Sequence, residues 1–182
     1  MEGRIGCVLA AGAGTRWGFP KILQPGWLDH AVGILRPYCG TVLVVTGPAR
    51  PPLPAGATEV HCTDWRAGLS ASFRAGVTVA DSAEHADQLV LVPVDTPGVT
   101  GAAVERMLLA ATGHAARAVY QGRPGHPVVL PRRLWRHALE LAEGDAGARQ
   151  LLRTLRSTGD LKLIECGDIS DGKDLDEPSD AL

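Results

Sequence analysis

The chain has 182 residues, of which 45% are hydrophobic, enough for one domain spanning residues 1–182 with a buried core. A formal net charge of −2 and scattered basic residues argue against nucleic-acid or membrane-surface binding, and 4% aromatic residues argue against base-stacking platforms. No apolar run approaches the ~18 residues of a transmembrane helix, and the first predicted strand begins so early that we expect no signal peptide.

The N-terminal half alternates short apolar runs with amphipathic stretches. Residues 4–10 predict a buried strand, residues 27–35 a helix ended by Pro37, and residues 41–46 a second strand rich in β-branched side chains. Residues 47–57 contain four prolines and two glycines and predict a loop. A short strand at 59–61 and a helix within 65–79, beginning around 68–72, follow.

The C-terminal half continues the alternation. The predicted elements are a buried strand at 89–95, a helix at 101–112, strands at 117–121 and 126–130, helices at 132–142 and 146–156, and a strand at 161–164. The strand at 126–130 follows a Gly-Arg-Pro-Gly turn, so we expect it to run antiparallel to its neighbour. Together the elements predict an α/β fold, a three-layer α/β/α domain with a mostly parallel sheet.

Cysteine and histidine spacings exclude several kinds of site. The four cysteines are far apart with no C-x-x-C, which favours buried thiols in a reducing cytoplasm and hence a cytoplasmic protein. No G-x-S-x-G occurs, and five histidines lack the spacing of metal ligands: His30, His61, His85, His114 and His137.

A glycine-rich loop follows the first predicted strand. Its glycines read G-x-G-x-x-x-G from Gly12, which is neither the dinucleotide G-x-G-x-x-G nor a P-loop. Pro20 disfavours an immediate helix, so we expect a long irregular loop. Glycines let backbone N–H groups approach an anion, and Arg16 and Lys21 add positive charge. The pattern indicates a phosphate cradle, with an ordinary glycine-rich connection as the alternative.

The loop resembles that of a known family. Leu9-Ala10-Ala11-Gly12-x-Gly14-x-Arg16-x-Gly18-x-Pro20-Lys21 is similar to the MobA-like NTP transferases, which include molybdenum cofactor cytidylyltransferase and guanylyltransferase. The resemblance implies a Rossmann-like nucleotidyltransferase fold of GT-A type. It implies nucleotide binding by Leu9, Ala10, Ala11, Gly12, Gly14, Thr15, Arg16 and Lys21. Leu-Ala-Ala-Gly, rather than Leu-Ala-Gly-Gly, resembles the cytidylyl branch.

Two acidic segments are candidates for a magnesium site. Val92-Pro93-Val94-Asp95-Thr96-Pro97 places Asp95 at the carboxyl end of a predicted strand, where α/β sheets bind ligands, although Asp95 could instead cap the next helix. The matching family segment carries a magnesium aspartate. The segment from Asp174 to Asp180 resembles the family's closing acidic motif imperfectly. By position Asp176 is the second predicted ligand, with Asp174 the alternate and a solvated tail the other interpretation.

Further segments match the family in order. The stretch from Asp64 to Ser72 resembles a segment on the nucleotide side of the cleft and adds Gly68, Ser70 and Ser72 to the predicted nucleotide site, unless they form a plain helix cap. Gly125-His126-Pro127 and Gly144-Asp145-x-Gly147-Ala148-Arg149 look like acceptor-side motifs of the cytidylyltransferases. The candidate acceptor residues are therefore His126, Asp145 and Arg149. The alternative interpretations are that His126 is an ordinary turn histidine and that Asp145 caps the start of a helix.

These matches predict a Mg²⁺-dependent nucleotidyltransferase. Its expected substrates are CTP and a phosphorylated acceptor such as molybdopterin, with a molybdoenzyme as a further partner. Arg16, Lys21 and Asp95 are the expected catalytic residues, and Asp95 and Asp176 the expected Mg²⁺ ligands. The chain passes from Lys21 directly into Gln24-Pro25-Gly26, without the family's longer stretch. This shorter loop and the altered acidic tail leave open a non-catalytic nucleotide- or cofactor-binding protein. Some relatives of this fold are described as oxidoreductases of the nicotine-blue type, so an NAD(P)H-dependent oxidoreductase is the other alternative.

Overall fold

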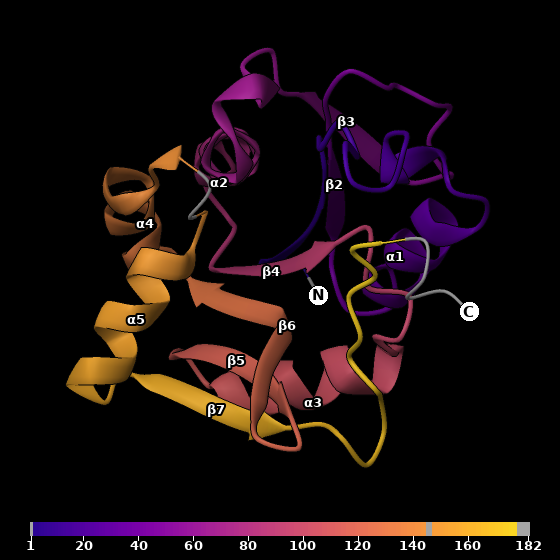
Figure 1. Ribbon diagram of the computed structural model, residues 1–182. Coiled ribbons are helices and arrows are strands. Elements are labelled where there is room, and N and C mark those ends of the chain that lie inside the picture. The colour runs from indigo at the N-terminus through magenta and orange to yellow at the C-terminus, as the bar shows by residue number, and fades with distance from the viewer. Residues whose placement is uncertain (1, 145–146, 178–182) are drawn as a thin grey trace.

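The computed structural model describes residues 2–144 and 147–177. Seven strands form one sheet in the order β3-β2-β1-β4-β6-β5-β7 (Figure 1). β6 runs antiparallel to both of its neighbours, and the other paired strands are parallel. The strands are β1 (Arg4–Ala10), β2 (Thr41–Thr46), β3 (Ala57–His61), β4 (Gln88–Pro93), β5 (Ala115–Tyr120), β6 (Arg123–Pro131) and β7 (Leu161–Glu165).

Helices cover both faces of this sheet (Figure 1). One face carries α1 (Trp27–Leu35) and α3 (Gly101–Ala111), and the other carries α2 (Leu69–Ser82), α4 (Trp135–Leu141) and α5 (Arg149–Thr158). Three short 3₁₀ helices complete the described elements: η1 (Lys21–Leu23), η2 (Trp65–Ala67) and η3 (Arg132–Leu134). The predicted three-layer α/β fold with a mostly parallel sheet is confirmed.

Alternation along the central strands produces two cores. In β1, Cys7 lies among the side chains beneath α2, whereas the next residue, Val8, lies among those beneath α1 and α3. Successive side chains of a strand point to opposite faces, so a strand covered on both sides must be apolar throughout. This requirement explains why β1, β2 and β4 read as continuous apolar runs.

Most differences from the predicted boundaries concern element ends. The strand predicted at 89–95 ends at Pro93, and the one predicted at 126–130 begins at Arg123, because the turn residues themselves pair with β5. The helix predicted within 65–79 begins at Leu69, inside the expected start at 68–72 and after the 3₁₀ turn η2, but it continues to Ser82. Part of the helix predicted at 146–156 lies outside the described residues, and α5 continues to Thr158.

The sheet order places two loops side by side. From β1 the chain proceeds outward through β2 and β3, then returns to add β4 on the other side of β1. Loops leaving the carboxyl ends of such strands diverge and leave a crevice that binds ligands in α/β proteins. The segment after β7 runs back to the same edge (Figure 1), where the Leu175 N–H donates to the Asp95 carbonyl oxygen at 2.9 Å.

Within residues 2–144 and 147–177, no helix is both long and apolar enough to cross a membrane.

Candidate active site

A cavity of about 1470 Å³ opens at the crevice between β1 and β4. Its wall is built by the loop after β1, the loop after β4, the start of α2, the β5–β6 hairpin and the segment after β7. Small-molecule sites usually measure ~300–1,000 Å³, so this cavity has room for two substrates.

The loop after β1 is irregular until η1, as the proline predicted. Its bend is fixed at Gly14, whose φ is 64° and whose carbonyl oxygen accepts the Gly18 N–H at 2.8 Å. A Cβ at Gly14 would overlap the carbonyl oxygen of Phe19, so only glycine fits there without a shift of the backbone. Gly12 differs, because a Cβ there would meet no atom within 4 Å and the residue lines the cavity.

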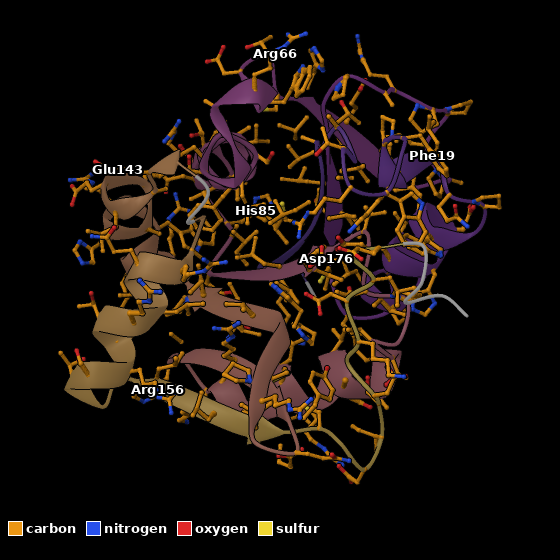
Figure 2. All side chains as sticks on the ribbon, in the orientation of Figure 1. Phe19, Arg66, His85, Glu143, Arg156 and Asp176 are labelled. Atoms are coloured by element: carbon orange, nitrogen blue, oxygen red, sulfur yellow. The ribbon has the colours of Figure 1, made fainter. Side chains whose placement is uncertain are left out.

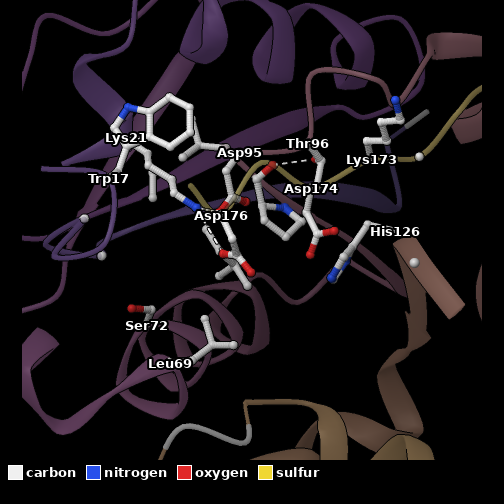
Figure 3. A pocket seen from close by; sticks show the side chains of 18 of the residues that line it. Trp17, Lys21, Leu69, Ser72, Asp95, Thr96, His126, Lys173, Asp174 and Asp176 are labelled. Carbon is white, nitrogen blue, oxygen red and sulfur yellow. Dashed lines mark hydrogen bonds and ion pairs between the residues drawn. The ribbon is translucent and has the colours of Figure 1, made fainter. Parts of the chain in front are cut away.

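Lys21 lies at the meeting point of the loops (Figure 3). Its Nζ is 2.7 Å from Asp95 Oδ2 and 3.2 Å from Asp176 Oδ1. Arg16 approaches the same Asp176 oxygen at 3.7 Å, but from a side chain that is 70% exposed, compared with 13% for Lys21. The structure thus brings the three predicted catalytic residues and the predicted second metal ligand into one cluster.

Trp17 forms part of the wall beside this cluster. The Lys21 Nζ lies 5.7 Å from the Trp17 ring centroid, and the Trp17 ring packs at 5.1 Å against that of Trp27, the first residue of α1. A cation over an aromatic face is attracted by the ring quadrupole, so Trp17 helps to orient the ammonium group.

Asp95 is not a helix cap. The N-cap of α3 is Thr100, whose side chain accepts the Ala103 N–H at 3.2 Å, so the capping interpretation of Asp95 is wrong. Thr96 holds the turn, since its hydroxyl donates to the Pro93 carbonyl oxygen at 2.8 Å. The Asp95 carboxylate, 22% exposed, therefore faces the cavity rather than α3.

The two carboxylates fit a shared cation. Asp95 and Asp176 converge on one ammonium group, which shows that one positive centre can contact both. Within the described residues no cluster of three or more acidic, histidine or cysteine side chains is arranged to hold a metal. Mg²⁺ commonly takes only one or two carboxylates and completes its octahedron with waters and phosphate oxygens. The pair suits Mg²⁺ provided that Lys21 moves aside.

The start of α2 forms the opposite wall (Figure 3). Gly68 and Ser72 line the cavity there. Ser70 does not: its side chain is 1% exposed, and its hydroxyl is buried without a hydrogen-bond partner in the described structure. Helical geometry explains this difference, because Ser70 and Ser72 are two positions apart in α2 and their side chains point to nearly opposite sides of the helix. The structure therefore does not bring Ser70 to the predicted nucleotide site.

Two of the three acceptor-side candidates come from β6 and from the start of α5. These two, His126 and Arg149, both line the cavity, while Asp145 lies outside the described residues. Burial and the positive charge of Arg117 lower the pKa of His126 to about 4, so its ring is neutral at pH 7. The Tyr120 hydroxyl donates to the His126 carbonyl oxygen, which anchors the turn that carries the histidine.

Sequence reasoning missed several residues of the wall. Arg117 is the most notable, since one arginine in the apolar run Ala-Ala-Arg-Ala-Val was a usable signal. Trp17, in the middle of the glycine loop, was another. Other cavity-lining residues that were not predicted include Trp65, Arg66, Leu69, Tyr120, Arg123 and Lys173.

Comparisons with known proteins identify the family of the chain. The family model of the MobA-like NTP transferase domain matches residues 6–159. The chain is 36% identical over 191 residues to nicotine blue oxidoreductase of Paenarthrobacter nicotinovorans, covering 94% of this chain and 91% of that protein.

Solved structures share the fold. A homologue of Mycobacterium tuberculosis Rv0371c from Mycobacterium sp. strain JC1 is 26% identical, with a TM-score of 0.80 over 100% of this chain and 94% of that one. The 2-C-methyl-D-erythritol 4-phosphate cytidylyltransferase of Thermus thermophilus is 22% identical, with a TM-score of 0.74 over 99% and 95% of the two chains. Rv0371c itself, 23% identical with a TM-score of 0.77 over 98% and 95%, has been solved as a manganese complex. On the family match and the shared fold, this chain belongs to the MobA-like NTP transferase family.

Proposed function

We propose that the protein is a divalent-metal-dependent cytidylyltransferase that moves CMP from CTP to a phosphorylated acceptor, with molybdopterin as the candidate acceptor, and releases pyrophosphate. The observation that carries the proposal is the convergence of Lys21, Asp95 and Asp176 beside the glycine loop. This convergence would put positive charge and metal-binding oxygen atoms next to a triphosphate bound on the loop.

The glycine loop would hold the triphosphate. The backbone at Gly12 is open toward the cavity, so phosphate oxygens can approach its N–H groups without meeting a side chain. Arg16 and Lys21 would offset the charge that builds up on the α-phosphate and on the leaving pyrophosphate. Gly68 and Ser72, which line the cavity, would contact the nucleoside.

Asp95 and Asp176 would hold Mg²⁺, which when bound supplies positive charge to the phosphate oxygens. The acceptor phosphate oxygen forms a bond to the α-phosphorus of CTP, and the bond from that phosphorus to the bridging oxygen breaks, so pyrophosphate takes the electron pair. Positioning and electrostatic stabilisation provide the rate enhancement for such transfers, and no side-chain nucleophile is required.

Pyrophosphate release from CTP, Mg²⁺ and molybdopterin is the direct test. We expect release with the unaltered chain and a loss of roughly 10²–10³-fold in turnover with Asp95→Asn. Asp171→Asn is a matched control, because Asp171 lines the cavity but makes no ion pair with Lys21 in the described structure. Equal turnover by the Asp95→Asn protein would exclude the proposed mechanism.

A second candidate is an NAD(P)H-dependent oxidoreductase acting on a heterocyclic pigment such as nicotine blue. The 36% identity to nicotine blue oxidoreductase over nearly the whole chain favours it. The absence of G-x-G-x-x-G after β1 counts against it. Oxidation of NADPH at 340 nm in the presence of nicotine blue, independent of Mg²⁺ and of CTP, is the outcome that would select this function.

A further inference from the structure

One arginine lies in the middle of an apolar strand. β5 reads Ala-Ala-Arg-Ala-Val-Tyr, and Arg117 is only partly exposed between Val128 of β6 and Leu163 of β7. Ala115, two residues earlier, packs in the core beneath α4 and α5, so Arg117 projects from that same face. Burying part of a charged group costs free energy unless a partner compensates.

Its protein partners compensate little. The Arg117 Nε donates to the Gly125 carbonyl oxygen at 3.1 Å, and no ion pair of Arg117 occurs within residues 2–144 and 147–177. Burial, and then the charges of Arg149 and Arg156, lower the pKa of the guanidinium, while Asp174 opposes them. Arginine nevertheless stays protonated in proteins, so this end of the cavity holds a poorly balanced positive charge.

A buried, unpartnered polar atom lies in the same place. The Nδ1 of His126 is shielded from solvent and has no partner at hydrogen-bond geometry among the described residues, although the backbone of Leu91 interacts with the ring. Buried polar atoms normally have a partner, and an exception indicates a missing ligand or water. Gly125, His126, Arg117 and Arg149 all line the cavity. They are also near one another, since Arg117 donates to Gly125 and its charge acts on His126, while the charge of Arg149 acts on Arg117.

We infer that this part of the cavity is an anion subsite and that Arg117 is its specificity-determining residue, which binds the phosphoryl group of the acceptor. A guanidinium pairs with two phosphoryl oxygens at once, which a lysine ammonium cannot do with the same geometry. Arg149 at the start of α5 supplies the second positive charge. Naming the ligand as the acceptor rests on the proposed function, whereas the binding of a phosphoryl anion at Arg117 does not.

The test uses inorganic phosphate as the probe, titrated by calorimetry and by NMR of the His126 ring. We expect Arg117→Met to weaken phosphate binding at least tenfold and to abolish the phosphate-induced shift of the His126 signals. Arg156→Met is the matched control. It removes a neighbouring positive charge that does not line the cavity (Figure 2), and it should change the affinity less than threefold. Phosphate affinity within twofold of the unaltered chain in Arg117→Met would overturn the inference.

Two additions keep the outcome decisive. Arg117→Lys preserves the charge without the fork and should bind phosphate with intermediate affinity; if Arg117→Met does not fold, this variant and the His126 shift in the unaltered chain decide. If the phosphate-induced shift of the His126 signals is lost in Lys21→Met and kept in Arg117→Met, phosphate binds at the glycine loop, and the inference of a subsite at Arg117 is overturned.

CTP binding is measured separately by thermal shift. If CTP does not bind but phosphate still depends on Arg117, the proposed function fails while the anion subsite stands. If CTP binds and displaces phosphate from the His126 signal, the subsite belongs to the nucleotide and its assignment to the acceptor is overturned.

Discussion

Lys21 donates to Asp95 across 2.7 Å, although 74 residues separate them in sequence. Each follows one of the two adjacent parallel strands at the point where the order of the sheet reverses. The same ammonium reaches Asp176 at 3.2 Å. The protein's own cation therefore lies between the two proposed metal ligands. We therefore expect that a metal ion can bind to these two carboxylates only when Lys21 moves away from them toward a nucleotide.

Replacing Lys21 by methionine should separate metal binding from catalysis. Without the ammonium, a metal ion no longer competes with Lys21 for Asp95 and Asp176, so Lys21→Met should bind Mn²⁺ severalfold more tightly than the unaltered chain in the absence of nucleotide. Its turnover should fall by roughly 10²–10³-fold. Electron paramagnetic resonance of free Mn²⁺ measures the affinity. Lys173→Met controls for the change of net charge, and weaker Mn²⁺ binding by Lys21→Met would contradict this expectation.

The two acids of the C-terminal segment should behave differently. Asp176 contacts Lys21, whereas Asp174 acts electrostatically on Arg117. Asp176→Asn should therefore lose the Mg²⁺-dependent part of CTP-induced stabilisation, and Asp174→Asn should keep it. Thermal unfolding with CTP, with and without Mg²⁺, measures both. The reverse result would make Asp174 the metal ligand.

Two glycines of the same loop should respond oppositely to alanine. Gly14→Ala imposes a strained φ of 64° and a clash with Phe19, and should lower the free energy of unfolding by about 1–3 kcal/mol. Gly12→Ala meets no neighbour within 4 Å and should leave that free energy unchanged. It should still weaken CTP binding, because its methyl group points into open space at the proposed cradle. Chemical denaturation and calorimetric titration distinguish the two effects; tight CTP binding by Gly12→Ala would contradict the cradle.

His126 gives stability a defined pH dependence. Burial, and then Arg117, lower its pKa from 6.5 to about 4 in the folded chain. Between pH 6.5 and 4 the unfolded chain binds the proton and the folded chain does not, so the free energy of unfolding falls as the pH falls through that window. In urea titrations, His126→Gln should reduce the dependence of the free energy of unfolding on pH in this range. Glu59→Gln is the control, because hydrogen bonds from Arg50 and then Thr46 hold the pKa of Glu59 at about 2 and its contribution is lost below pH 4.5. An unchanged slope in His126→Gln would contradict burial of a neutral ring.

Local patterns were sufficient for most of the fold. Continuous apolar runs with flanking turns identified the strands to within a few residues. A strand buried on both faces needs consecutive apolar residues, and a turn needs particular residue types at adjacent positions, so both can be recognised locally. The loop after β1 was expected to be irregular from Pro20 alone. Element ends such as Pro93 and Ser82 were missed, because the exact end of a strand or helix depends on tertiary contacts.

The site was harder to predict than the fold. The residue patterns and the family resemblance together pointed to Lys21, Asp95 and Asp176, but their mutual contact depends on the sheet order, which no local pattern encodes. Ser70 was included as a hydroxyl near a helix start, and helical phase decided against it. Arg117 was passed over because its significance comes from Gly125, Arg149 and Asp174, which lie further along the chain.

The most direct test of the central claim is thermal unfolding with CTP, GTP, ATP and NADPH, each with and without Mg²⁺. A ligand at a hundred times its Kd adds about 2.7 kcal/mol, which raises the Tm of a chain of this size by roughly 5–10 °C. We predict Mg²⁺-dependent stabilisation by CTP that Asp95→Asn abolishes. Stabilisation by NADPH with no response to any triphosphate would contradict the account and select the oxidoreductase.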